Sequence, residues 1–244
     1  MVLYYTLYMI ILAGLCFVFL VFLGLDEYRK KHDRKLLQSV TSLDRGTYSE
    51  RVLVLSLLKH GIPAEYIFHD LYLKMDNNQF SQIDVAIVTD IGIIIFEVKD
   101  YSGWLLGNSY NSYWTQVLAY GREKYRFYNP IRQNYNHIQN LHKHISGFEN
   151  VPIYSAVVFY GNCVLRHIEN LPNTVMIGKS EEIFYSLKEL LKKHTPVSYM
   201  NKEKVLNFLK ESVDNGANTD IQHQHIENIT TMLGSYKKTY HQYS

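Results

Sequence analysis

Cysteine, proline, glycine and net charge are all scarce in this chain of 244 residues. Its two cysteines, Cys16 and Cys163, provide no disulfide framework, which agrees with a reducing compartment. Five prolines and 13 glycines, beside 47% hydrophobic residues, indicate a globular rather than a disordered chain. The formal net charge of +2 produces no strong basic field of the kind that attracts nucleic acid. Any nucleic-acid function must therefore depend on a local site.

Charged side chains are absent from the first 25 residues. The apolar stretch at 2–25 is long enough, as a helix, to cross a hydrocarbon core of about 30 Å. Three tyrosines near its start, Tyr4, Tyr5 and Tyr8, lie where an interfacial aromatic belt would be. A cleaved signal peptide is the competing interpretation, but the stretch has no basic n-region, is too long and is followed by no A-x-A site. We therefore expect residues 1–25 to form a transmembrane anchor.

Basic residues follow this stretch and none precedes it. They are Arg29, Lys30, Lys31, Arg34 and Lys35. Because lysine and arginine near a membrane span stay on the cytoplasmic side, we expect a single-pass cell-membrane protein whose soluble domain faces the cytoplasm. Residues 26–44 are expected to form a polar linker, which the sequence also allows to be helical.

The remaining residues alternate between helical and strand patterns. Helices are predicted at 48–60, 131–145, 181–194 and 201–213, and strands at 66–73, 82–89, 92–99, 153–160 and 174–178. A turn is expected at 101–107 and a polar tail after 213. This order predicts an α/β fold with a mixed sheet flanked by helices. We expect one domain at 45–180, followed by a C-terminal helical extension and tail at 181–244.

Charged residues interrupt the apolar faces of three of these elements. In the strand at 92–99, Glu97 and Lys99 extend the row formed by Ile93 and Ile95, because side chains alternate between the faces of a strand. Burying such charges is costly unless they are paired or bind a ligand. The strand end is therefore either a solvated end or a site.

Two further acids lie among apolar neighbours. Helical spacing places Glu50 on one face with Leu53, Val54 and Leu57. Strand alternation places Asp84 on one face with Ala86 and Val88, and Ile83, Val85 and Ile87 on the other. The alternative interpretation is that Asp84 caps a turn.

These acids suit divalent-metal chemistry. Two carboxylates close together repel each other unless a cation lies between them, and a hard ion such as Mg²⁺ prefers oxygen ligands. Mg²⁺ held by Asp84 and Glu97 would acidify a bound water, and Lys99 would orient that water and stabilise developing negative charge. This is chemistry for phosphodiester hydrolysis, although the spacing alone also occurs by chance.

Four motifs, in this order, resemble the NERD domain, the nuclease-related domain that is grouped with the PD-(D/E)XK nucleases. They are RGTYSE (45–50), QIDVAIV (82–88), GIIIFEVKDYSGW (92–104) and YNPIRQN (128–134), and the resemblance covers about residues 45–160. It implies a restriction-endonuclease-like core. It also implies that the catalytic residues are Glu50, Asp84, Glu97, Lys99 and Gln133, with Asp84 and Glu97 as ligands of Mg²⁺ or Mn²⁺.

The sequence departs from the family pattern at two positions. Ile83 stands in place of the proline in the superfamily's name, and Val85 stands where NERD sequences commonly have histidine. The first matters little for the site. At the second position this chain has Val85, so any role that the family's histidine plays is not carried over to this chain.

We therefore expect a membrane-anchored, Mg-dependent nuclease that hydrolyses phosphodiester bonds in nucleic acid, in DNA rather than RNA. The alternative is a catalytically inactive, membrane-tethered module that binds nucleic acid or acts as a scaffold. A purely structural membrane protein explains neither Glu50 nor Asp84.

Other polar and aromatic groups are interpreted as structural. The helix at 131–145 has a predicted apolar stripe of Ile131, Tyr135, Ile138, His142 and Ile145, and a polar stripe of Gln133, His137, Asn140 and His144. The polar stripe could contact phosphates but is more typical of a solvated face, and only Gln133 gains a role from the resemblance. Trp104 and Trp114 are assigned to core or turn packing, and Cys163 to a buried position. His223 and His225 are two apart, so on a helix they do not face one metal ion.

Overall fold

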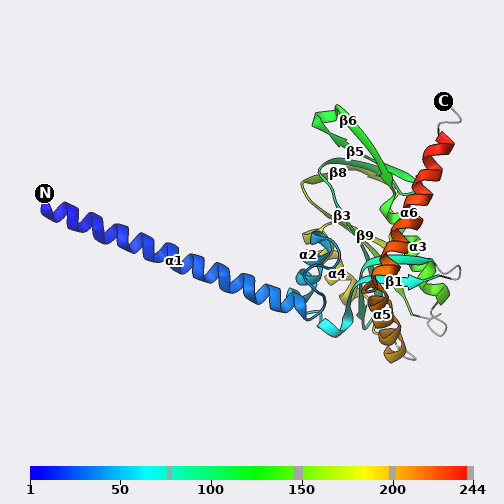
Figure 1. The fold of residues 1–244 in the computed structure, drawn as a ribbon, viewed down its shortest axis with the longest axis horizontal. Coiled ribbons are helices and arrows are strands. Elements are labelled where there is room, and N and C mark those ends of the chain that lie inside the picture. Colours follow the sequence, from blue (N-terminus) through cyan, green and yellow to red (C-terminus); the bar gives the residue numbers. More distant parts are fainter. Residues whose placement is uncertain (76–78, 145–150, 198–201, 241–244) are drawn as a thin grey trace.

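The computed structural model describes residues 1–75, 79–144, 151–197 and 202–240 (Figure 1). Its helices are α1 (Val2–Gln38), α2 (Tyr48–Lys59), α3 (Pro130–His144), α4 (Ser180–Lys193), α5 (Lys202–Gly216) and α6 (Thr219–Tyr240), with short 3₁₀ helices η1 (Ala64–Tyr66) and η2 (Ala119–Gly121). Its strands are β1 (Ile67–Lys74), β2 (Phe80–Thr89), β3 (Gly92–Asp100), β4 (Gly103–Asn108), β5 (Tyr113–Leu118), β6 (Glu123–Tyr128), β7 (Ile153–Tyr160), β8 (Cys163–Glu169) and β9 (Val175–Lys179).

The strands form two mixed sheets. Sheet A has the order β1-β2-β3-β7-β9, in which β1, β2 and β3 are antiparallel neighbours and β3, β7 and β9 are parallel. Sheet B has the order β6-β5-β4-β8. The predicted α/β fold with a mixed sheet and flanking helices is therefore confirmed.

Helices cover both faces of sheet A. On one face, Leu53 of α2 and Ile183 of α4 pack with Phe96 of β3. On the other face, Leu141 of α3 and Leu209 of α5 pack with strand residues that include Ile95. The strand β3 is central and fully buried along its apolar part, so charges at its end lie between two helical layers.

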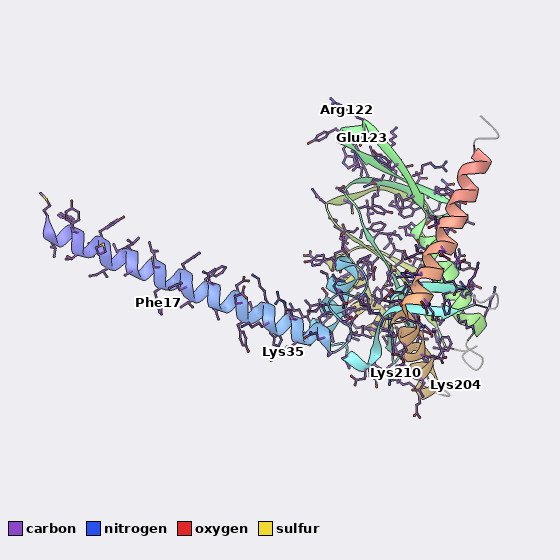
Figure 2. The ribbon with its side chains drawn as sticks, in the orientation of Figure 1. Phe17, Lys35, Arg122, Glu123, Lys204 and Lys210 are labelled. Carbon is purple, nitrogen blue, oxygen red and sulfur yellow. The ribbon has the colours of Figure 1, made fainter. Side chains whose placement is uncertain are left out.

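The N-terminal helix is longer than the predicted anchor. It is apolar and long enough to span a membrane, and it projects away from the rest of the chain (Figure 1). The helix continues past residue 25 and ends at Gln38. Figure 2 shows Phe17 on its projecting part and Lys35 close to the body of the protein.

The end of α1 packs into the core. Leu37 is buried in the same cluster as Leu53, and the Lys59 ammonium of α2 lies 2.7 Å from the Asp33 carboxylate. The segment predicted as a polar linker is thus helical over most of its length, and it is attached to the domain by side-chain contacts.

Several predicted elements differ from the structure. The turn predicted at 101–107 is wrong, because most of it forms β4, which pairs with β5 and β8. Sheet B was missed because its strands are short and β6, with the sequence EKYRFY, is mostly exposed and has no apolar alternation. The polar tail predicted after 213 is largely helical, because α5 extends to Gly216 and α6 follows it.

The predicted apolar stripe of the helix at 131–145 is only partly right. Its buried residues are Ile131, Asn134, Ile138 and Leu141. Tyr135 is 59% exposed and His142 is exposed, while Ile145 lies outside the described residues. Asn134 is buried although it is polar, and its side-chain N–H groups donate to the backbone carbonyls of Ile95 and Ala156 inside the core.

The alternation predicted for β2 fails at Asp84. Ile83 packs with Ala86 and Val88 rather than with Val85. The β1–β2 ladder joins His69 to Val85 and Leu71 to Ile83 but skips the level between them, where Asp70 has a φ of 56°. This irregularity twists both strands at Asp70 and Asp84. As a result, Ile83 lies on the face of Ala86 and Val88, whereas strict alternation places it with Val85 and Ile87.

Candidate active site

The end of β3 carries the central ion pair of the site. Glu97 is 1% exposed, and the Lys99 Nζ lies 2.5 Å from its Oε1. Lys99 also donates to the Gln133 Oε1 of α3 at 3.1 Å. Both residues lie on the α3 face of sheet A, as strand alternation predicts. The structure thus brings together three of the five predicted site residues.

Helix α3 contributes a residue that the sequence interpretation missed. The His137 Nε2 lies 3.4 Å from the Glu97 Oε2, and its Nδ1 lies 2.9 Å from the Ser81 hydroxyl. Asn140, one turn further, donates to the same hydroxyl. The interpretation of this polar stripe as a solvated face is therefore wrong. The spacing of Gln133 and His137, four residues apart, was the signal that could have identified both as site residues.

The electrostatics of Glu97 and Lys99 are reciprocal. Burial raises the pKa of Glu97, but Lys99 and His137 outweigh burial and hold that pKa below its usual value. Burial lowers the pKa of Lys99, and the nearby Glu97 and Asp84 carboxylates reverse this effect and raise it. The contacts of Glu97 are ion pairs, and neither of its buried oxygens accepts a well-formed hydrogen bond from the described residues. This carboxylate therefore retains the capacity to bind a cation.

Asp84 lies at the irregularity in β2. Its Oδ2 accepts a hydrogen bond from the Val98 N–H at 2.7 Å, which ties it to the strand position between Glu97 and Lys99. Burial, followed by repulsion from Glu97 and Glu50, raises the pKa of Asp84 well above its usual range. Three carboxylates thus interact across the end of the sheet, and Lys99 only partly offsets their repulsion.

Glu50 is fixed in the first turn of α2. Thr47, the N-cap, accepts a hydrogen bond from the Glu50 N–H and donates its hydroxyl to the Glu50 Oε1 at 2.8 Å. The His69 Nε2 lies 3.2 Å from the other oxygen, and the His69 Nδ1 contacts the Thr41 hydroxyl at 2.8 Å. Burial raises the pKa of Glu50, but the bonds from His69 and Thr47 outweigh it and lower that pKa. Glu50 is therefore held as an anion.

Two of the motifs also contain residues with structural roles. Arg45 donates to the Asp70 carboxylate at 3.1 Å, and Gln82 donates to its other oxygen at 2.8 Å, which holds the irregular part of β1 against β2. Gly46 has a φ of +62°, and a Cβ there would lie 2.4 Å from a Glu50 oxygen. A side chain at Gly46 would therefore displace Glu50.

The donor set fits one kind of metal ion. Within residues 1–75, 79–144, 151–197 and 202–240, no three His, Cys, Asp or Glu side chains form a ready metal cluster. Mg²⁺ is usually held by one or two carboxylates, with waters and substrate phosphates completing its coordination. Asp84 and Glu97, whose carboxylate oxygens are held in ion pairs with Lys99 and His137, match that requirement, whereas a structural zinc cage would require more ligands.

Comparison with known proteins agrees with this geometry. Residues 45–160 match the family model of NERD, the nuclease-related domain. An uncharacterized protein of Bacillus anthracis is 26% identical over 185 residues, which cover 75% of this chain and 79% of that protein. No solved structure matches the chain. Residues 45–160 are thus similar to the nuclease-related domain, and the mixed sheet between two helical layers is consistent with the PD-(D/E)XK superfamily.

Proposed function

We propose, from the nuclease-related domain at residues 45–160, that this protein is a membrane-anchored nuclease that hydrolyses phosphodiester bonds with Mg²⁺ or Mn²⁺. One observation carries the proposal. Glu97 is buried without a well-formed hydrogen bond, and it lies beside Lys99 and within electrostatic range of Asp84. Such a carboxylate pair is costly in a purely structural role and useful for holding a divalent cation.

Each residue has a role in this mechanism. Asp84 and Glu97 would hold the cation, and the ionised Glu50 adds negative charge that would favour its binding. A bound cation would supply acidification of a water molecule and polarisation of a phosphoryl oxygen. Lys99 remains protonated, so it orients the attacking water and stabilises the charge that develops on the phosphate. Gln133 accepts a hydrogen bond from Lys99 and thereby aims its ammonium group.

Removing the metal tests the function directly. We expect the full-length chain, purified in neutral detergent, to cleave nucleic acid with Mg²⁺ or Mn²⁺ and to be inactive with EDTA. Duplex DNA, single-stranded DNA and RNA are compared on gels, and DNA is expected to be the better substrate. If none is cleaved, and Glu97→Ala binds them as tightly as the parent chain, the nuclease proposal fails and a catalytically inactive tethered module replaces it.

We further propose that α1 spans the membrane and that the domain faces the cytoplasm. The helix is apolar over a membrane-spanning length, and the lysines and arginines at 29–35 follow its apolar part on the side of the domain. We expect the chain to sediment with membranes after high-salt washing and a reporter fused to its C-terminal end to behave as cytoplasmic. Recovery of a shorter, secreted chain would contradict the anchor, and a reporter active outside the cell would contradict the orientation.

A further inference from the structure

The two faces of sheet B differ in character. One face packs on the rest of the protein, because Trp114 and Leu105 lie in a buried cluster with Phe159 of β7 and Ile131 of α3. Figure 1 shows β5, β6 and β8 at the end of the body away from α5. The opposite face of sheet B is the one available to a partner.

Three cations project from that opposite face. Val117 of β5 pairs with Lys124 of β6 on one side and with Trp104 of β4 on the other. Arg126 lies two residues after Lys124 in β6. Paired residues share a face, so these side chains are on the same side of the sheet. The Arg166 guanidinium of β8 lies 4.2 Å from the Trp104 ring and so joins them. We call Lys124, Arg126 and Arg166 the cationic face.

No acid neutralises the cationic face among the residues that the structure describes. The three side chains are exposed and form no ion pair with a described carboxylate. The two acids in the strands of sheet B have other partners, because Glu123 accepts from the Tyr125 hydroxyl and Glu169 accepts from the Asn108 amide. The charge of this face is therefore directed at solvent, where it attracts a polyanion.

Stacking prepares the two arginines for phosphate contacts. The Arg126 guanidinium lies 4.8 Å from the centre of the Tyr113 ring, and Arg166 covers Trp104 in the same way. A guanidinium positioned over a ring by cation–π attraction can still use its N–H groups for bonds to phosphate oxygens. Each arginine lies over one face of its ring, so that face is not open to stack on an unpaired base. Contacts made through these arginines are therefore directed at the phosphate backbone rather than at the bases.

The spacing of the cations also suits duplex DNA. Lys124 and Arg126 are two residues apart on one edge strand, about 7 Å along it. Arg166 lies on the other edge strand, and the three inter-strand spacings between them amount to about 14 Å. That separation is close to the width of the major groove of B-DNA, about 12 Å. The cationic face can therefore contact phosphates on both sides of a groove.

Sheet B is joined firmly to the elements of the candidate active site. Lys99 is four residues before Gly103, the first residue of β4, and β6 leads into α3 through Asn129. The Asn129 amide donates to the backbone carbonyls of Ser109 and Asn111 in the turn between β4 and β5, while its side-chain oxygen accepts from the Ile131 N–H of α3. A substrate held by sheet B is thus held by the same structure that places Gln133 and Lys99.

We propose that the cationic face binds the phosphate backbone of duplex DNA and so holds a DNA substrate on the protein that carries the site at the end of β3. This inference deepens the proposed function and rests on it for the class of substrate.

The test measures binding separately from cleavage. A labelled 30-base-pair duplex is titrated with full-length protein in neutral detergent and EDTA, and the dissociation constant is read by fluorescence anisotropy at several salt concentrations. The variant Lys124→Gln/Arg126→Gln/Arg166→Gln is compared with Lys188→Gln/Lys193→Gln/Lys210→Gln, which removes the same charge from other exposed sites. Figure 2 shows Lys210 at the opposite end of the body from Arg122 and Glu123, at the tip of sheet B.

The expected result follows from counterion release. The slope of log K against log salt concentration becomes about 0.9 less steep for each phosphate contact that is lost. We therefore expect the cationic-face variant to bind DNA roughly 100-fold more weakly at 0.1 M salt and to show a clearly smaller slope. The control variant is expected to stay within about threefold of the parent chain. Equal weakening of both variants, or unchanged binding by the cationic-face variant, would overturn the inference.

The same titrations separate this inference from the nuclease proposal. If the parent chain cleaves nothing with Mg²⁺ but the cationic-face variant still loses duplex binding, the binding face stands and the nuclease proposal fails. If the parent chain cleaves DNA and the cationic-face variant binds normally, the nuclease proposal stands and the binding face fails. A variant that loses single-stranded DNA or duplex RNA binding but not duplex DNA binding would also overturn the inference.

Discussion

Replacing Lys99 by alanine is expected to slow phosphodiester cleavage by on the order of 10²–10³, while metal binding and nucleic-acid binding stay nearly unchanged. The Lys99 ammonium lies 2.5 Å from the Glu97 carboxylate and is aimed by Gln133, so it is the cation best placed to stabilise charge that develops on a phosphate at this site. Its effect is confined to the transition state, because Asp84 and Glu97 remain to hold the metal ion. Cleavage rates at saturating Mg²⁺ and substrate measure the loss.

A second lysine in sheet A provides the control for Lys99. Lys74 ends β1 and is exposed, so Lys74→Ala removes a similar charge from a strand end without affecting the site. Lys99→Met, which keeps most of the aliphatic stem, separates loss of charge from loss of packing. If either Lys99 variant cleaves within about threefold of the parent chain, Lys99 is not catalytic. If metal affinity falls together with cleavage, Lys99 instead organises the carboxylates.

Replacing Asp84 by asparagine is expected to have opposite effects on the metal-free and the metal-bound protein. In EDTA the variant should unfold at a higher temperature, by about 3 °C for each 1 kcal/mol gained in a chain of this size. The gain arises because burial and the Glu97 and Glu50 carboxylates disfavour a charge at Asp84 and raise its pKa. The asparagine oxygen can still accept the hydrogen bond from the Val98 N–H, so the strand end keeps its geometry.

With Mg²⁺ the same substitution is expected to remove stabilisation and activity. A ligand that binds only the folded state at 100 times its dissociation constant adds about 2.7 kcal/mol, and Asp84→Asn should lose most of that increase along with cleavage. Thermal unfolding with and without Mg²⁺ measures both effects. The exposed Asp90, in the turn after β2, offers a matched Asp90→Asn control that should change neither. A metal-free variant less stable than the parent chain would show that the Asp84 charge is favourable, contrary to the repulsion inferred here.

Local sequence patterns determined much of the fold. A break-free apolar run predicted the long helix at the N-terminus, and the alternation of Ile93, Ile95, Glu97 and Lys99 predicted which face the charges occupy. These features depend only on the period of the backbone, 3.6 residues in a helix and two in a strand, so they can be read without knowledge of the partners. The family resemblance added Gln133, which the interpretation of the polar stripe as a solvated face did not single out.

Tertiary structure decided the features that depend on distant partners. Whether the polar stripe of α3 faces water or Glu97 depends on how that helix packs on sheet A, so His137 was predicted to be solvated although it contacts the site. The continuation of α1 past residue 25 is stabilised by the packing of Leu37 in the core and by the ion pair between Asp33 and Lys59. Neither partner lies within the segment itself.

The position of Asp84 shows this division most clearly. The sequence by itself established that an acid interrupts an apolar strand. Such an acid is notable because burying a charge is costly unless the charge is paired or binds a ligand. Only the folded chain determined where that acid points, since the irregular pairing of β1 with β2 rotates the strand, and Arg45 and Gln82 hold Asp70 at that break. Strand alternation is a local property, whereas a break in it is stabilised by hydrogen bonds from residues far away in the chain.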